Sequence, residues 1–210
     1  MLVAFDFDGT LSDSEMTVLL GERRGVADEM AAITERAMND EIEYATSLRE
    51  RAALLDGLPE SEAAAAFDEV VLRDGAAEVI DALRAAGHTV AVLTGGFERG
   101  VEAALARAGT TVDVVVANRL PVADGELTGE VEGPLIEGTK DDELARLSTE
   151  YGVPVADTVA VGDGANDLPM LEAAGLAVGF APKPAVAPAC DETVTTMPDL
   201  LALFETHGLV

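Results

Sequence analysis

The chain has 210 residues, enough for one hydrophobic core and a modest second domain. Its 40 acidic and 13 basic residues give a formal net charge of −27, which disfavours nucleic acid as a partner because phosphates would be repelled. It has one cysteine, no basic segment ahead of an apolar one, and no apolar run near the roughly 20 residues of a membrane helix, so we expect a soluble, cytoplasmic protein without membrane contacts.

The first predicted element is a short, fully buried strand, residues 2–7, that ends in two aspartates. Asp6 and Asp8 are two residues apart, so their side chains leave the strand on the same face. Two like charges at the end of a buried strand need compensation, either by a divalent cation or by a site that keeps one carboxyl group protonated. A solvated Asp-Gly turn is the simpler interpretation of this segment taken alone.

The next segment, residues 14–71, contains no convincing strand and is predicted to form several amphipathic helices. Glycines at positions 21, 25 and 57 indicate the turns between them. Because the segment falls between the first strand and the next strand–helix unit, we expect a helical cap inserted over the carboxyl edge of a sheet.

From residue 72 onward, strand-like and helical patterns alternate. Strands are predicted at 89–94, 112–117, 158–163, 176–180 and 192–196, and helices, each followed by a glycine, at 76–86, 98–108, 141–151 and 167–174. A hairpin is predicted at 123–126, inside an insertion near 118–133. The pattern is typical of an α/β fold with a Rossmann-like doubly wound parallel sheet, here with a core of 1–13 and 72–210 and a helical cap of 14–71.

In an open α/β sheet, ligands bind outside the carboxyl ends of the strands, so the residues that follow each strand are candidates for a site. The strand at 89–94 ends in Thr94, Gly95 and a second glycine. A hydroxyl, free backbone N–H groups and the N-terminus of the next helix suit an oxyanion, although Gly-Gly is common in such loops.

The strand at 158–163 leads into Asp163 and Asp167, whose carboxylates can coordinate a hard cation such as Mg²⁺ or orient its ligands. Lys140 opens the preceding helix, and a lysine kept in a chain that has only two suits the neutralisation of phosphate charge. Taken singly, the acidic segment could be a solvated loop and Lys140 a surface residue. The stretch 181–189 is predicted to be a surface loop with Lys183 in solvent.

Four separated motifs agree in order and spacing: DFDGT at 6–10, TGG at 94–96, Lys140, and GDGAND at 162–167. Together they resemble the haloacid dehalogenase superfamily of phosphatases over nearly the whole core. The resemblance implies that Asp6 is the nucleophile and Asp8 the general acid and base. A second acid at position 8 favours phosphoryl transfer over dehalogenation, since the dehalogenase branch lacks it.

The resemblance also implies the remaining roles. Mg²⁺ would be held by Asp6, by Asp8 through its backbone carbonyl, and by Asp163 and Asp167. Thr94 and the Gly95 N–H would bind the phosphate, and Asn166 would orient the phosphate or Lys140. Lys140 would be the catalytic cation that neutralises the phosphate charge.

Within the superfamily, the chain resembles the branch that hydrolyses L-phosphoserine. In that branch a glutamate at the place of Glu15 holds the substrate ammonium, and an arginine at the place of Arg51 holds its carboxylate. One anion and one bidentate cation suit a zwitterionic amino acid. Without that context, Glu15 and Arg51 could be solvated helix charges.

We therefore expect a Mg²⁺-dependent phosphomonoester hydrolase, a monomer or a homodimer, that converts L-phosphoserine into L-serine and phosphate through an aspartyl phosphate. A phosphatase of the same fold for phosphoglycolate, a sugar phosphate or homoserine phosphate would use the same catalytic residues. From a different class, the acids, Thr94 and Lys140 could form a phospho-accepting signalling module, although such receivers lack a large cap.

The charge composition resembles that of cytoplasmic proteins from extreme halophiles. Only Lys140 and Lys183 are lysines, and the other basic residues are arginines. Because repulsion among the acids destabilises the compact state unless salt screens it, we expect folding that depends on salt.

Overall fold

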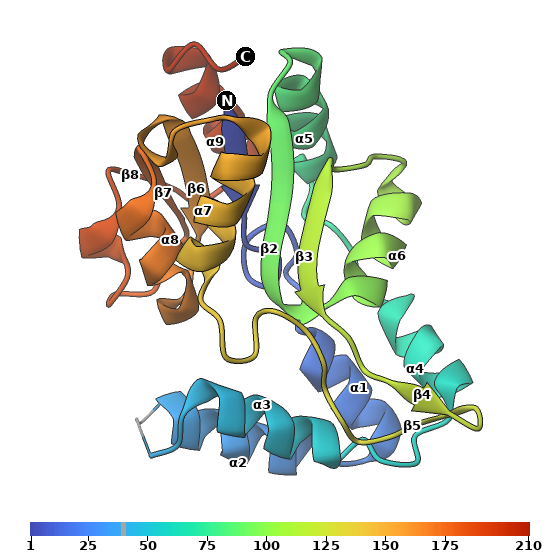
Figure 1. The fold of residues 1–210 in the computed structure, drawn as a ribbon. Helices are drawn as coiled ribbons and strands as arrows, with labels where there is room; N and C mark the ends of the chain where they lie inside the picture. The colour runs from blue at the N-terminus through green and yellow to red at the C-terminus, as the bar shows by residue number, and fades with distance from the viewer. Residues whose placement is uncertain (39–40) are drawn as a thin grey trace.

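The computed structural model describes residues 1–38 and 41–210, which form a parallel sheet with helices on both faces and a further layer of helices at one end (Figure 1). The six strands of the sheet are β1 Leu2–Phe5, β2 Thr89–Phe97, β3 Val114–Asn118, β6 Thr158–Gly162, β7 Leu176–Phe180 and β8 Glu192–Val194. All pair in parallel, in the order β3-β2-β1-β6-β7-β8. This confirms the predicted doubly wound α/β fold, and the strand order reverses between β1 and β6.

Helices cover both faces of the sheet. One face is covered by α5 Ala76–Ala85, α6 Glu98–Ala108 and α9 Met197–Thr206, and the other by α7 Lys140–Tyr151 and α8 Leu168–Ala173. In β1, Val3 and Phe5 pack into the apolar cluster on the α5 and α9 side, whereas Leu2 and Ala4 pack into the cluster on the α7 and α8 side. Because successive side chains of a strand alternate between faces, Asp6 continues the row that faces α7.

Most predicted strands and helices after residue 72 differ from the observed ones by one or two residues at their ends. The largest difference is in β2, which continues through the Gly-rich turn to Phe97, with a shift of its register against β3 after Leu93. β1 ends earlier than predicted because the chain turns after Phe5, although Phe7 is still fully buried. The segment after β6 forms a short 3₁₀ helix, η2 Ala165–Asp167, before α8.

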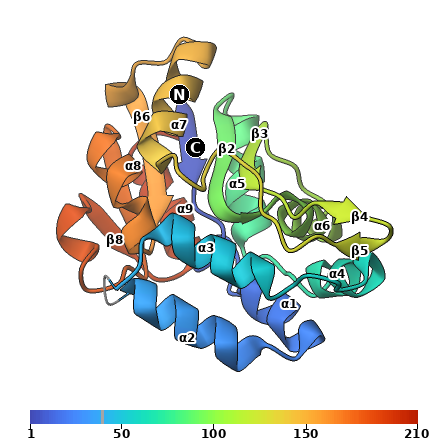
Figure 2. The same cartoon turned by 60° about the horizontal axis from the view of Figure 1, so that its bottom comes forward.

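The segment between β1 and α5 forms the layer of helices that faces the carboxyl ends of the strands (Figure 2). Its helices are α1 Met16–Arg24, α2 Ala27–Met38, α3 Tyr44–Ala53 and α4 Glu60–Phe67, and the described part of the segment contains no strand. The division into a cap of 14–71 and a core of 1–13 and 72–210 stays a prediction.

The predicted hairpin is formed by β4 Val122–Ala123 and β5 Glu126–Leu127, and it packs on this helical layer rather than on the main sheet. The Gly57 N–H donates to the Leu127 carbonyl at 2.9 Å, and the Glu60 N–H donates to the Gly125 carbonyl at 2.8 Å. The sequence predicted the turn but not its partner, because backbone pairing of this kind needs no particular side chain.

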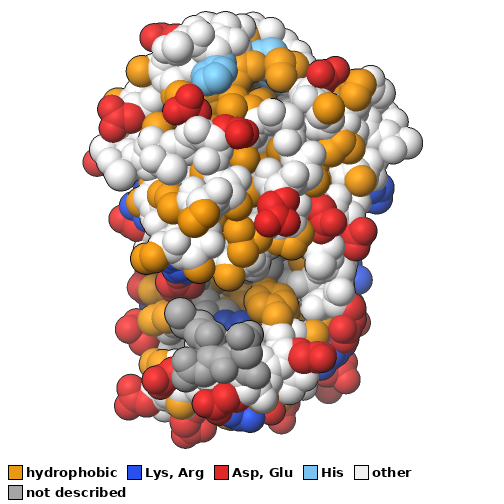
Figure 3. All heavy atoms as spheres, turned by 90° about the vertical axis from the view of Figure 1, so that its left-hand side faces the viewer, with side chains coloured by type: hydrophobic (Ala, Val, Ile, Leu, Met, Phe, Trp, Pro, Cys, Tyr) orange, Lys and Arg blue, Asp and Glu red, His pale blue; other side chains and the backbone are white. Residues whose placement is uncertain are grey.

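Acidic side chains are spread over the face of the molecule drawn in Figure 3, which is hollowed between the sheet-bearing part and the helical layer. Salt-dependent folding stays a prediction. Among the described residues, no helix is both long enough and apolar enough to cross a membrane.

Candidate active site

Three aspartates from separate segments meet at the carboxyl edge of the sheet, where the strand order reverses. Asp6 follows β1, Asp163 follows β6, and Asp167 ends η2. One carboxylate oxygen of each lies within 4.8 Å of the others, and all three residues are buried. The structure thus brings together three of the predicted residues at the position where open α/β sheets bind ligands.

Lys140, the first residue of α7, lies among these carboxylates. Its Nζ donates to Asp6 Oδ1 at 2.6 Å and to Asp167 Oδ1 at 2.5 Å. Burial alone would lower the pKa of Lys140, but the charges of Asp167 and Asp6 outweigh burial and raise this pKa above its ordinary value. The lysine is therefore a permanent positive charge that balances two of the three acids.

The two aspartates of the first motif are both harder to ionise than ordinary aspartates. Burial, with the charge of Asp167 adding to it, raises the pKa of Asp6 to about 7, although Lys140 opposes the shift. Burial also raises the pKa of Asp8 well above its usual range, and the charge of Asp6 adds to this effect. Asp8 Oδ1 is buried without a hydrogen-bond partner among the described residues. Both ways of offsetting the repulsion between these aspartates are therefore compatible with the structure: a cation could bind among the three clustered acids, and a proton could be held on Asp8.

Asp167 is the most firmly held of the three acids. Its Oδ2 accepts hydrogen bonds from the backbone N–H groups of Asp163, at 2.9 Å, and Gly164, at 2.8 Å, while Lys140 binds Oδ1. With both oxygens occupied by protein donors, Asp167 is arranged to orient the cluster as much as to bind a ligand.

Asp163 has weaker partners. Its Oδ1 accepts from the Thr10 hydroxyl at 3.3 Å, and its Oδ2 lies 3.4 Å from the Nζ of Lys183. Lys183 is more than half exposed, but it is not simply solvated as expected, because its backbone N–H donates to the Asp163 carbonyl at 2.9 Å and brings the side chain alongside. Asp163 and Asp6 therefore retain free lone pairs, and their donor chemistry fits a hard divalent cation.

The predicted phosphate-binding turn lies at the end of β2. Thr94 is buried, and its Oγ1 accepts from the Gly96 N–H at 3.0 Å. Asn118 fixes the turn from the side: its Nδ2 donates to the Gly95 carbonyl at 3.0 Å, and its Oδ1 accepts from the Leu135 N–H at 3.1 Å. Asn118 was not among the predicted site residues, and its sequence signal was only a polar residue at the end of a strand.

The predicted substrate-binding residues of the helical layer lie near the acids without pairing to them. Arg51, on α3, donates from Nε to the Ser47 carbonyl at 3.3 Å. Burial lowers the pKa of Arg51, opposed by the charges of Tyr44, Glu15 and Asp8, which therefore lie within electrostatic reach of it. Glu15 is the exposed residue ahead of α1, and its side chain does not cap that helix.

Tyr44, the first residue of α3, was missed by the sequence interpretation. Its hydroxyl lies against Gly95, so a Cβ at position 95 would press on the hydroxyl and the tyrosine side chain would have to shift. Burial of the hydroxyl raises the pKa of Tyr44, although the residue as a whole remains partly exposed. Tyr44 thus links the helical layer to the Gly-rich turn of β2.

Asn166 is exposed on η2, with its side-chain oxygen close to Gly164. Within the described ranges, the hydrogen bonds of Lys140 Nζ go to Asp6 and Asp167 and not to Asn166. Its proposed orientation of Lys140 is therefore not formed in this structure, whereas a contact with phosphate stays a prediction.

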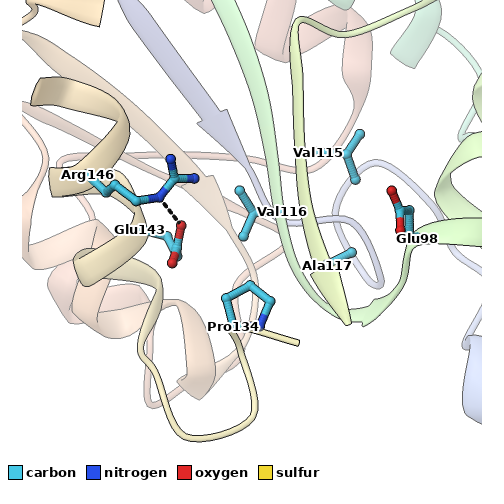
Figure 4. A pocket seen from close by; sticks show the side chains of 7 residues that line it. All are labelled: Glu98, Val115, Val116, Ala117, Pro134, Glu143 and Arg146. Atoms are coloured by element: carbon cyan, nitrogen blue, oxygen red, sulfur yellow. Dashed lines mark hydrogen bonds and ion pairs between the residues drawn. The ribbon is translucent and has the colours of Figure 1, made fainter. Parts of the chain in front are cut away.

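A separate pocket of about 280 Å³ lies beside the edge strand β3 (Figure 4). It is lined by Glu98, Val115, Val116, Ala117, Pro134, Glu143 and Arg146. The guanidinium of Arg146 is already paired with Glu143 at 2.7 Å, and none of the predicted site residues lines the pocket. The acidic cluster, rather than this pocket, is the candidate active site.

The model of the haloacid dehalogenase-like hydrolase family matches residues 3–172. The chain belongs to this family. It is 59% identical over 208 residues to a phosphoserine phosphatase of Halobacterium salinarum, with 99% of each chain covered. It is also 41% identical over 207 residues to a phosphoserine phosphatase of Streptococcus thermophilus, covering 97% of this chain and 94% of that protein.

Solved structures similar to this family member include a substrate-bound phosphoserine phosphatase complex, with a TM-score of 0.87 and 36% identity. A phospho-aspartyl intermediate analogue of phosphoserine phosphatase has the same TM-score of 0.87, at 37% identity. In both comparisons 96% of this chain and 97% of the other are covered. Haloacid dehalogenase-like phosphatases generally use a divalent metal, and the three clustered aspartates could bind one.

We expect the affinity for a divalent cation to fall as the pH falls below about 7. The pKa of Asp6 is about 7, so below it the carboxyl group is protonated and must lose its proton before it can bind the cation. Isothermal titration with Mg²⁺ as the probe should show roughly tenfold weaker binding about one pH unit below this pKa than well above it. Asp157→Asn, which alters an exposed acid, should behave like the unmodified chain. Equal affinity at both pH values would contradict the expectation.

Proposed function

We propose that the chain is an L-phosphoserine phosphatase, a Mg²⁺-dependent hydrolase of a small phosphomonoester that acts in the cytoplasm. One observation carries the proposal: Asp6, Lys140, Asp163 and Asp167 form one buried cluster at the edge of the sheet that faces the helical layer. The 59% identity to a phosphoserine phosphatase along the whole chain supports the choice of substrate.

Asp6 is the nucleophile. Lys140 holds its Oδ1, which leaves Oδ2 to attack phosphorus in line, so that a bond from Asp6 to phosphorus forms as the serine ester bond breaks. Asp8 donates a proton to the departing serine oxygen, and burial suits it to this task because burial raises its pKa and so favours the protonated form. Once ionised, Asp8 takes a proton from the water that hydrolyses the aspartyl phosphate.

Asp6, Asp163, Asp167 and the backbone carbonyl of Asp8 would hold Mg²⁺, which supplies positive charge against the repulsion between a carboxylate and a phosphate dianion. Lys140 adds a fixed positive charge beside the nucleophile. The remaining donors for the phosphate oxygens are the Thr94 hydroxyl, the Gly95 N–H and the Asn166 amide.

Glu15 and Arg51 give the site its preference for an amino acid. Glu15 binds the substrate ammonium, and the guanidinium of Arg51 binds the carboxylate through two parallel hydrogen bonds. Their nearness to Asp8 supports this role, because a substrate of the size of phosphoserine must reach both the acids and the helical layer.

We expect the purified chain with Mg²⁺ to release phosphate from L-phosphoserine, and EDTA to abolish the release. Asp6→Asn should reduce the release to background, because an amide cannot form the covalent intermediate. Asp157→Asn is the matched control and should retain full activity. If Asp6→Asn released phosphate at a near-normal rate, the covalent mechanism would be wrong. If a different ester were hydrolysed and phosphoserine were not, the substrate assignment would be wrong.

We expect Arg51→Ala to raise KM for L-phosphoserine by about tenfold to a hundredfold, because a charge-assisted hydrogen bond is lost. KM for p-nitrophenyl phosphate, which has no carboxylate, should change by less than about threefold. Arg49→Ala is a matched control from the same helix, where Arg49 pairs with Glu137. Steady-state kinetics with both substrates measure the difference, and equal effects of Arg51→Ala on both would argue against carboxylate binding.

A further inference from the structure

We propose that Arg73 is a positioning residue for the reaction, whose guanidinium clamps the turn directly after Asp8 and thereby fixes the general acid. The inference rests on the proposed function and deepens it. Arg73 belongs to none of the sequence motifs and lies where the chain returns from the helical layer to α5.

The contacts of Arg73 are directed at the backbone of the turn. Its Nε donates to the Thr10 carbonyl at 3.0 Å, and its Nη2 donates to the Gly9 carbonyl at 3.2 Å. Its own N–H donates to the Leu11 carbonyl at 2.8 Å. Three consecutive carbonyls after Asp8 are thus bound by one residue, and a planar guanidinium can hold two of them in a fixed geometry that an ammonium group cannot reproduce.

The clamp is itself anchored to the sheet. The guanidinium carbon of Arg73 lies 5.4 Å from the centre of the Phe180 ring, and Phe180 is the buried last residue of β7. Such stacking limits the freedom of the arginine side chain, so that the turn is held against a rigid element.

The turn also has backbone hydrogen bonds of its own, from the Gly9 N–H to the Ser12 carbonyl at 2.8 Å and from the Thr10 N–H to the Phe7 carbonyl at 3.1 Å, and the contacts of Arg73 tie this folded turn to the sheet. Gly9 has φ +90°, a left-handed conformation, and a Cβ there would lie 2.5 Å from Asp163 Oδ1, so no side chain at position 9 can pack. The Thr10 hydroxyl donates to Asp163 Oδ1 at 3.3 Å. A shift of the turn would move Asp8, and small displacements of a catalytic group are costly.

This role has a kinetic signature. Asp8 must protonate the serine oxygen in the first step, because an alkoxide is a poor leaving group. p-Nitrophenolate leaves without protonation, so transfer of the phosphoryl group from p-nitrophenyl phosphate to Asp6 does not need a well-placed general acid. A residue that acts by positioning Asp8 should therefore matter in the first step for alkyl phosphates and not for aryl phosphates.

Arg73→Lys tests the proposal, because lysine keeps the positive charge and one donor group but loses the planar guanidinium that binds two carbonyls at once. In rapid-mixing experiments with Mg²⁺, it should slow formation of the phosphoenzyme from L-phosphoserine by about tenfold or more. Formation from p-nitrophenyl phosphate, followed as a burst of nitrophenolate, should change by less than about twofold. The matched control is Arg107→Lys: Arg107 also donates to a carbonyl of the returning segment, Val70, at 3.3 Å, but does not touch the turn. It should leave both rates unchanged.

Equal slowing with both substrates, or no slowing with either, would overturn the proposal, since a purely structural role predicts a shared loss. If Arg73→Lys does not fold, Phe180→Leu, which removes only the ring beneath the guanidinium, must show the same selective slowing to a smaller degree.

Failure of the proposed function can be distinguished from failure of this proposal, because the unmodified chain would then not act on phosphoserine. The comparison would be made with another alkyl phosphate that it hydrolyses, and if it hydrolysed none, both proposals would fall.

Discussion

The hydrogen bonds of Lys140 to Asp6 and Asp167 are the interaction on which the rest of the site depends. Three carboxylates buried within a few ångströms of one another repel, and taking them out of water is costly. A buried lysine with a raised pKa offsets part of that cost and leaves the cluster short of positive charge. That remaining deficit makes the edge of the sheet a place for a cation and for the phosphate that a cation attracts.

The fold explains why these groups meet. β1 and β6 are neighbours in the sheet although they are distant in sequence, so the residues after both strands face the same space. Alternation along β1 directs Asp6 toward the face covered by α7, whose first residue is Lys140. On the other side of the site, the helical layer brings Tyr44 against Gly95 and Arg51 within reach of Asp8. Under the proposed function, the strand ends would carry the reacting groups, and the helical layer would carry those that choose the substrate.

Much of the candidate site could be predicted from the sequence, because several of its residues lie at or just after the ends of predicted strands. Asp6 and Asp163 follow recognisable buried strands and Thr94 lies near the end of another, and parallel strands place their carboxyl ends together. The pairing of Lys140 with Asp167 could not be predicted, since it depends on how α7 is set against the sheet. Asn118 and Arg73 were missed for a related reason: both bind backbone carbonyls, which leave no pattern in the sequence.

The location of a bound cation tests the central claim most directly. Crystals of the chain grown with Mn²⁺ in place of Mg²⁺ can locate the ion by its anomalous scattering. The expected result is one strong peak between the carboxylates of Asp6 and Asp163, with Lys140 still bound to Asp167. A peak elsewhere, with Asp6 and Asp163 free of metal, would contradict the view that these acids form a cation-dependent phosphatase site.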